Sequence, residues 1–118
     1  MANGASDAIT TLFSMLFGNE KDGIMLPIPQ YPLYSALIAL NKGITVPYYL
    51  DESKNWGLDM KNLEENYAKA KKEGTNVKAI VVINPGNPTG AVLTEENMKD
   101  IINFCAKNHL ILLADEVY

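Results

Sequence analysis

The feature that most constrains the fold of this chain is an unbroken apolar run that ends in a loop of turn-forming residues. The run covers Ala79 to Ile83, and the loop at 84–90 reads Asn-Pro-Gly-Asn-Pro-Thr-Gly. Two Asn-Pro steps and two glycines extend neither a strand nor a helix, so the loop lies at the carboxyl end of a buried strand. In open α/β sheets ligands bind at that end. The alternative is a turn that is merely rich in turn-forming residues.

A second apolar run places an acid at the end of another strand. Residues 110–114 read Leu-Ile-Leu-Leu-Ala, and Asp115 follows them directly. Between the two runs Thr94 caps a helical pattern whose electropositive first turn carries two glutamates. An order of strand, loop, helix and strand predicts two strands that are parallel neighbours or nearly so.

The rest of the chain also alternates between helical and strand patterns. We expect four helices, which begin near Asp7, Leu33, Asp59 and Thr94. The expected strands cover residues 24–28, 44–50, 79–83 and 110–115. This alternation predicts one α/β domain with a doubly wound, mostly parallel sheet and flanking helices.

Three local expectations follow from apolar periodicity and from proline. Pro27 places the strand 24–28 near an edge of the sheet or ends it at Leu26. The first helix is expected to be largely buried, because its apolar residues recur at helical spacing. These residues are Ile9, Leu12, Phe13, Leu16 and Phe17. The last helix carries an apolar stripe of Met98, Ile101, Ile102, Cys105 and Ala106, which makes Cys105 a core thiol.

Composition argues against several classes of function. The 118 residues include ten lysines, fourteen acids and no arginine, with a net charge of −4. Binding to nucleic acid or to an acidic membrane therefore has little electrostatic support. One cysteine and one histidine exclude an internal disulfide and build no metal site without carboxylates. The apolar stretch from Ala8 to Phe17 is too short to span a bilayer.

Two stretches near the start of the chain have the chemistry to face a ligand. The free amides around Ala5 and Ser6, with the Ser6 hydroxyl, can bind an anion at the positive end of a helix. The alternative is that Ser6 is an ordinary N-cap. Tyr31 is held extended by Pro32, and its ring either faces a ligand or packs in the core.

Four motifs together resemble those of the pyridoxal-phosphate-dependent aminotransferases of fold type I, and most closely the alanine aminotransferases. They are Asn3-Gly4-Ala5-Ser6, Pro29-Gln30-Tyr31-Pro32-Leu33-Tyr34, the loop at 84–90, and Ala114-Asp115-Glu116-Val117-Tyr118. The resemblance covers essentially the whole chain, but only part of such an enzyme. It implies that residues 1–118 are a partial pyridoxal-phosphate-binding large domain.

The resemblance also implies roles for individual residues around the cofactor pyridoxal 5'-phosphate. Ala5 and Ser6 would hold its phosphate, the Tyr31 ring would stack on its pyridine ring, and Asp115 would keep the ring nitrogen protonated. Asn87 and Tyr118 would hydrogen-bond its phenolic oxygen. Asn87 would also touch the substrate carboxylate, and the Asn87-Pro88 bond is expected to be cis.

One part of the family pattern has no match in the chain. None of the ten lysines has the context of the Schiff-base lysine, and the arginines that hold phosphate and substrate carboxylate are missing. We therefore expect the catalytic lysine and these arginines to lie outside the chain. The 118 residues alone are expected to be inactive.

The implied function of the complete protein is the transfer of an amino group between L-alanine and 2-oxoglutarate. Its partners would be an amino acid and a 2-oxo acid, its assembly a homodimer, and its location the cytoplasm, with the mitochondrion as an alternative. Two other functions stay open. A lyase of the aminocyclopropane-carboxylate synthase type would share the cofactor site, and a transcription regulator could use such a domain to bind a ligand.

Overall fold

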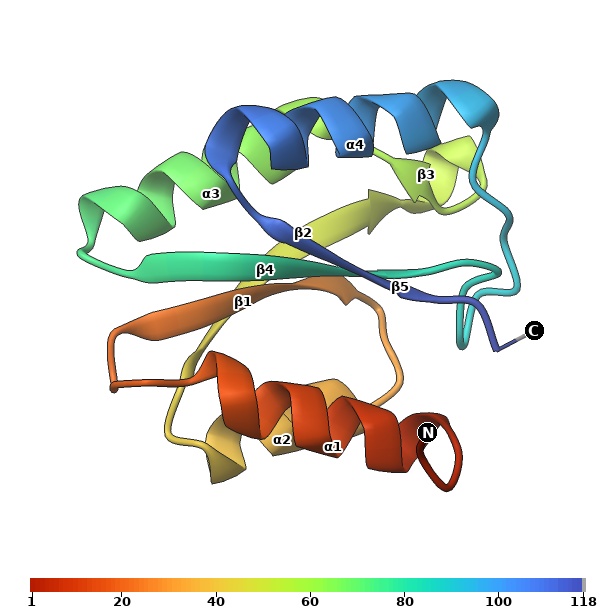
Figure 1. Cartoon of the computed structure of the whole chain (residues 1–118). Coiled ribbons are helices and arrows are strands. Elements are labelled where there is room, and N and C mark those ends of the chain that lie inside the picture. The colour runs from red at the N-terminus through yellow and green to blue at the C-terminus, as the bar shows by residue number, and fades with distance from the viewer. Residues whose placement is uncertain (118) are drawn as a thin grey trace.

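The computed structural model describes residues 1–117 as a five-stranded sheet between two layers of helices (Figure 1). The strands lie in the order β3-β2-β1-β4-β5. The strands are β1 (Asp22–Ile28), β2 (Ile44–Asp51), β3 (Gly57–Leu58), β4 (Asn76–Ile83) and β5 (Ile111–Asp115). The helices are α1 (Ala5–Leu16), α2 (Leu33–Leu40), α3 (Met60–Lys72) and α4 (Glu95–Asn108), with a short 3-10 turn at Glu52–Lys54.

The predicted doubly wound, mostly parallel sheet is confirmed. β2, β1, β4 and β5 pair in parallel, and among residues 1–117 only the two-residue β3, which was not predicted, is antiparallel. Figure 1 shows α1 and α2 on one face of the sheet and α3 and α4 on the other. Each face has its own cluster of buried side chains, so the sheet is covered on both sides.

The prediction that Pro27 marks an edge strand is wrong, because β1 lies at the centre of the sheet. Its pairing with β4 ends at Met25, opposite Ile80, whereas its pairing with β2 continues to Ile28. Pro27 lies beyond the last residue of β1 that pairs with β4, so its missing N–H breaks no hydrogen bond on that side. Asp22 and Gly23, which precede the expected strand 24–28, are already part of β1.

The expected burial of α1 is also wrong. Phe13 is its one buried residue, and the side chains of Leu12 and Met15 are 44% and 77% exposed. α1 lies against the sheet and α2 (Figure 1). The side that it packs there is narrower than the arc its apolar residues cover, so Leu12 and Met15 stay exposed.

The predicted apolar stripe of α4 needs a similar correction. Ile101 and Cys105 are buried as expected, but Ile102 is 55% exposed and Met98 is 39% exposed. Phe104, which the prediction omitted, is buried and packs edge-on against the ring of Tyr67 in α3. Helical spacing leaves the phase of the buried face open by about one residue, and the packing against α3 fixes it.

The predicted caps of the last two helices are confirmed. The Asp59 carboxylate accepts a hydrogen bond from the amide of Asn62, and the Thr94 hydroxyl accepts one from the amide of Asn97. Among the helices of residues 1–117, none has the length and apolar character that crossing a bilayer requires.

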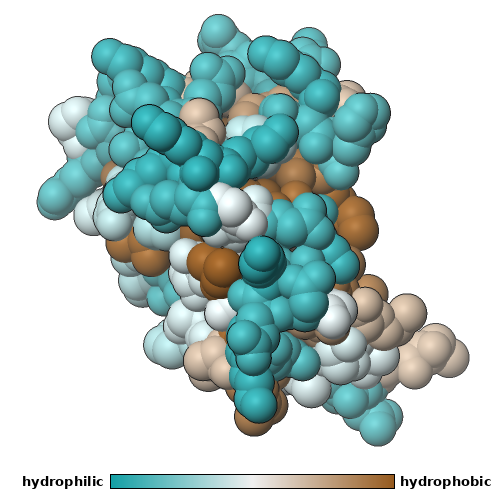
Figure 2. Space-filling view, turned by 90° about the vertical axis from the view of Figure 1, so that its left-hand side faces the viewer, coloured by the Kyte–Doolittle hydropathy of each residue, from teal (hydrophilic) through white to brown (hydrophobic). Residues whose placement is uncertain are grey.

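A buried carboxylate, that of Asp22, lies at the end of the sheet where the parallel strands begin. Asp22 is fully buried and accepts hydrogen bonds from the amides of Gly18 (2.7 Å) and Asn19 (3.0 Å) and from Asn76 Nδ2 (2.9 Å). Lys78 Nζ lies 3.1 Å from its Oδ2. Burial acts to raise the pKa of Asp22, but these donors outweigh it and lower the pKa to about 2. Figure 2 views the molecule from this side, where hydrophilic side chains dominate the upper part of the surface.

Candidate functional site

The opposite end of the sheet, at the carboxyl ends of β4 and β5, carries a cavity of about 250 Å³. All five described residues that the sequence analysis assigned to the cofactor line it. These residues are Ala5, Ser6, Tyr31, Asn87 and Asp115, and Ile9, Leu33, Ile83 and Val117 complete the wall. The sixth, Tyr118, lies outside the described residues. The structure thus brings together residues that come from four separate parts of the chain.

The start of α1 forms one end of this cavity. Gly4 is the N-cap, with φ of 106°, and no side chain caps the helix, so the alternative reading of Ser6 as the N-cap is wrong. The amides of Ala5 and Ser6 have no hydrogen-bond acceptor among residues 1–117. Unpaired amides at a helix N-terminus, together with the helix dipole, favour an anion there.

The loop at 84–90 forms a second wall and is fastened to the end of β5. The Asn84 amide donates to the carbonyl of Asp115 (3.0 Å), and Asn84 Oδ1 accepts from the amide of Leu93 (3.0 Å). These bonds span the base of the loop and hold half-buried Asn87 at the cavity wall. The Asn87-Pro88 bond is cis, as predicted, and the Asn84-Pro85 and Ile28-Pro29 bonds are cis as well.

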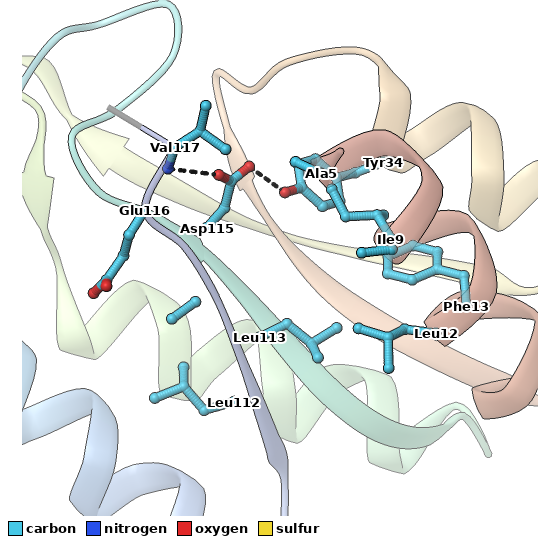
Figure 3. A pocket seen from close by; sticks show the side chains of 12 residues that line it. Ala5, Ile9, Leu12, Phe13, Tyr34, Leu112, Leu113, Asp115, Glu116 and Val117 are labelled. Carbon is cyan, nitrogen blue, oxygen red and sulfur yellow. Dashed lines mark hydrogen bonds between the residues drawn. The ribbon is translucent and has the colours of Figure 1, made fainter. Parts of the chain in front are cut away.

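Asp115 ends β5, where it pairs with Ile83 of β4, and both its carboxylate oxygens have partners (Figure 3). Oδ1 accepts from the amide of Val117 at 3.3 Å. Oδ2 accepts from the hydroxyl of Tyr34, a residue of α2. Burial, and then the bond to the Asp115 carboxylate, raises the pKa of Tyr34, so its hydroxyl stays protonated and remains a donor.

Tyr34 is a residue of this site that was not predicted from the sequence. Its only signal was membership of the motif that carries Tyr31, and its partner Asp115 lies 81 residues further along the chain. Helical spacing gives Tyr34 a place in the core, which it also occupies, with a side chain that is 2% exposed. Only the assembled fold shows that its hydroxyl meets the carboxylate at the end of β5.

A second cavity, of about 390 Å³, lies between α1 and β5 and shares Asp115 with the first (Figure 3). Its wall is largely apolar, with Leu12 and Phe13 from α1 facing Leu112 and Leu113 from β5. Figure 3 shows Asp115 and Tyr34 pointing toward one another, while Glu116 points away. Asp115 is therefore the acid that the two cavities have in common.

The donor set around the first cavity fits a flat aromatic ligand with an anion at one end and an N–H group elsewhere on its ring. The α1 amides suit the anion, the half-exposed Tyr31 offers an aromatic face, and the Asp115 carboxylate suits a ring N–H. Asn87 adds a side-chain amide, which can donate or accept. Pyridoxal phosphate has each of these groups, so the residues present fit it.

Comparison with known proteins agrees with this chemistry. The profile of the family described as aminotransferase class I and II matches residues 1–118. The chain is 57% identical to mitochondrial alanine aminotransferase 2 of Arabidopsis thaliana and covers 22% of that protein. It is 51% identical to glutamate–glyoxylate aminotransferase 2 of the same plant and covers 24% of it. Both alignments cover 100% of this chain.

A solved structure with the same fold is that of an alanine aminotransferase from Pyrococcus furiosus. The TM-score is 0.86 at 30% sequence identity, over 96% of this chain and 27% of the other. The chain therefore spans about a quarter of the length of the proteins it matches.

Proposed function

We propose that this chain, which belongs to the class I and II aminotransferase family, is the cofactor-facing part of the large domain of an alanine aminotransferase. Members of this family use pyridoxal phosphate to move amino groups between amino acids and 2-oxo acids. The substrates we propose are L-alanine and 2-oxoglutarate, on the strength of the 57% identity to a plant alanine aminotransferase. The observation that carries the proposal is the single cavity that Ala5, Ser6, Tyr31, Asn87 and Asp115 line together.

The start of α1 holds the cofactor phosphate in this proposal. The amides of Ala5 and Ser6 donate to its oxygens, and the Ser6 hydroxyl adds a third donor. The chain has no arginine to complete a bidentate clamp, so the helix terminus supplies the positive potential from this side of the site.

Asp115 holds a proton on the ring nitrogen. When bound, the cofactor supplies an electron sink for the electron pair left on the substrate when its α proton is removed. A carboxylate in hydrogen-bond contact with the ring N–H favours the protonated ring through a charge-assisted bond. Asp115 is suited to this task because it ends β5, where its pairing with Ile83 of β4 fixes the backbone that carries it.

Asn87 and Tyr31 orient the remaining groups. The Asn87 amide hydrogen-bonds the phenolic oxygen and the substrate carboxylate, and the Tyr31 ring stacks on the pyridine face. We assign Tyr118 to the phenolic oxygen as well. None of the ten lysines lines the cavity, so we place the covalent lysine outside residues 1–118. A homodimeric assembly and a cytoplasmic or mitochondrial location remain part of the proposal.

A second candidate reaction is the transfer of an amino group from glutamate to glyoxylate. The 51% identity to a glutamate–glyoxylate aminotransferase favours it, and the same cofactor site would serve both reactions. The full-length protein should be assayed with alanine plus 2-oxoglutarate and, separately, with glutamate plus glyoxylate. Formation of pyruvate and glutamate at the higher kcat/KM supports the first candidate, and formation of 2-oxoglutarate and glycine supports the second.

The same assay can overturn the cofactor assignment. Asp115→Asn should slow the half-reaction with the preferred amino acid by roughly a thousandfold, which corresponds to roughly 4 kcal/mol. If the wild-type protein turns over neither pair, or if Asp115→Asn reacts at the wild-type rate, the proposed function is wrong.

A further inference from the structure

Tyr34 is a buried residue of the site for which the proposed function has no use. Its side chain is 2% exposed, and its ring packs against Phe13 of α1 with the centroids 6.0 Å apart. The ring belongs to a buried cluster that α1, α2, β1 and β4 build, and β5, which carries Asp115, adds only the partly buried Leu113 to it. The Tyr34 hydroxyl meets the Asp115 carboxylate from outside the strand on which that carboxylate lies.

The second partner of Asp115 is local and weaker. The amide of Val117 lies 3.3 Å from Oδ1 and belongs to the same stretch of chain, so it moves when Asp115 moves. An ionised carboxylate has about four acceptor sites, of which Tyr34 and Val117 occupy two. Acceptor capacity therefore remains for a third donor in the cavity.

We propose that Tyr34 is a positioning residue, which holds the Asp115 carboxylate in the orientation that receives the ring N–H of the cofactor. This inference rests on the proposed function. Without the Tyr34 hydroxyl, the half-buried carboxylate keeps, among residues 1–117, only the amide of its own turn and is free to rotate. A preorganised partner for the ring nitrogen then becomes a mobile one, which weakens its bond.

The chain offers a matched control for the substitution of Tyr34. Tyr48 is also 2% exposed, and its hydroxyl donates to the carbonyl of Val81 at 2.7 Å. Tyr34→Phe and Tyr48→Phe each remove one buried hydroxyl and one hydrogen bond, but only Tyr34 contacts Asp115. A purely structural role for Tyr34 predicts that the two variants behave alike.

The test is the affinity of the full-length apoprotein for pyridoxal phosphate and for its analogue with carbon in place of the ring nitrogen. We expect Tyr34→Phe to bind pyridoxal phosphate about tenfold more weakly, and Tyr48→Phe to change the affinity by less than about twofold. In an Asp115→Ala background, or with the carbon analogue, Tyr34→Phe should change the affinity by less than about twofold.

Two results would overturn this inference and leave the proposed function intact. One is wild-type affinity in Tyr34→Phe, and the other is a tenfold loss that persists in the Asp115→Ala background. If Asp115→Ala itself leaves the affinity for pyridoxal phosphate unchanged, the proposed function fails instead. Should Tyr34→Phe not fold, 3-fluorotyrosine at position 34 keeps the hydroxyl. Its fluorine resonance must then move in the Asp115→Ala variant, and an unmoved resonance contradicts the contact.

Discussion

Replacement of Asp22 by alanine should destabilise the protein more than replacement of a solvent-exposed carboxylate does. Asp22 is the fully buried acceptor at the amino-terminal end of the sheet, where it holds the Gly18-Asn19 turn and the first residues of β4. Asp22→Ala removes the acceptor of the amides of Gly18 and Asn19 and of the Asn76 side chain. A donor that stays buried without a partner costs about 1–3 kcal/mol, but Gly18, Asn19 and Asn76 are exposed residues, so water can replace part of the lost acceptor.

The ammonium group of Lys78 limits the damage. Its side chain is 34% exposed and Nζ also donates to the carbonyl of Leu16 at 2.9 Å, so water and this carbonyl remain as partners. Removal of Asp22 also removes the cost of burying its charge, which offsets part of the loss. We therefore expect Asp22→Ala to lower the free energy of unfolding by about 3 kcal/mol.

Urea unfolding of the full-length protein measures this difference, with Asp59→Ala as the matched control. The Asp59 carboxylate accepts one hydrogen bond, from the amide of Asn62 at 3.2 Å, and caps α3. Its loss should cost about 1 kcal/mol. If Asp22→Ala costs no more than Asp59→Ala, the buried carboxylate does not hold this end of the sheet, and the reasoning is refuted.

Three further predictions concern pH, packing and reactivity. The folded-state pKa of Asp22, about 2, lies below its usual 3.8, so the stability that Asp22 contributes is fully present above pH 3.8 and is lost as the pH falls through 2. Asp22→Asn should therefore reduce the change in the free energy of unfolding between pH 4 and pH 2, and an unchanged pH dependence would contradict this prediction. Gly23→Ala places a Cβ 2.7 Å from the Thr75 methyl and 3.1 Å from the Ile44 carbonyl oxygen. It should therefore lower the free energy of unfolding, measured in urea, by about 2 kcal/mol. Gly18→Ala, whose Cβ meets ordinary van der Waals contacts, should lower it by less. Cys105 is 6% exposed, and burial raises the pKa of its thiol. A thiol reagent should therefore label Cys105 slowly in the folded protein and faster once urea unfolds it. Equal labelling rates in the folded and unfolded protein would show that the thiol is accessible.

The parts of the fold that depend on neighbours in sequence could be predicted from the sequence. Asp59 and Thr94 cap their helices through amides three residues away, and the local pattern contains everything such a cap needs. The place of Asp115 follows in the same way, because the apolar run before it fixes where the strand ends. Five of the six predicted cofactor residues line one cavity because they lie at element ends or in loops at the same edge of the sheet.

The features that depend on distant parts of the chain could not be predicted in this way. A proline excludes a central strand only where that strand is paired on both sides at the proline itself. β1 no longer pairs with β4 at Pro27, and this short pairing is a property of the assembled sheet. Likewise, the exposure of Leu12 depends on how much of α1 the sheet covers. The contact between Tyr34 and Asp115 joins residues 81 positions apart, and it forms only when the helices have packed on the assembled sheet.

The most direct test of the central claim is the protonation state of the cofactor's ring nitrogen beside Asp115. Full-length apoprotein should be loaded with pyridoxal phosphate labelled with ¹⁵N in the ring, and the ¹⁵N chemical shift followed from pH 6 to pH 8. We predict a protonated ring nitrogen across this range in the wild type, because the carboxylate favours the charged ring, and an unprotonated one in Asp115→Asn. An unprotonated ring nitrogen in the wild type, or the same chemical shift in both proteins, would contradict the assignment of Asp115 and of the cavity it lines.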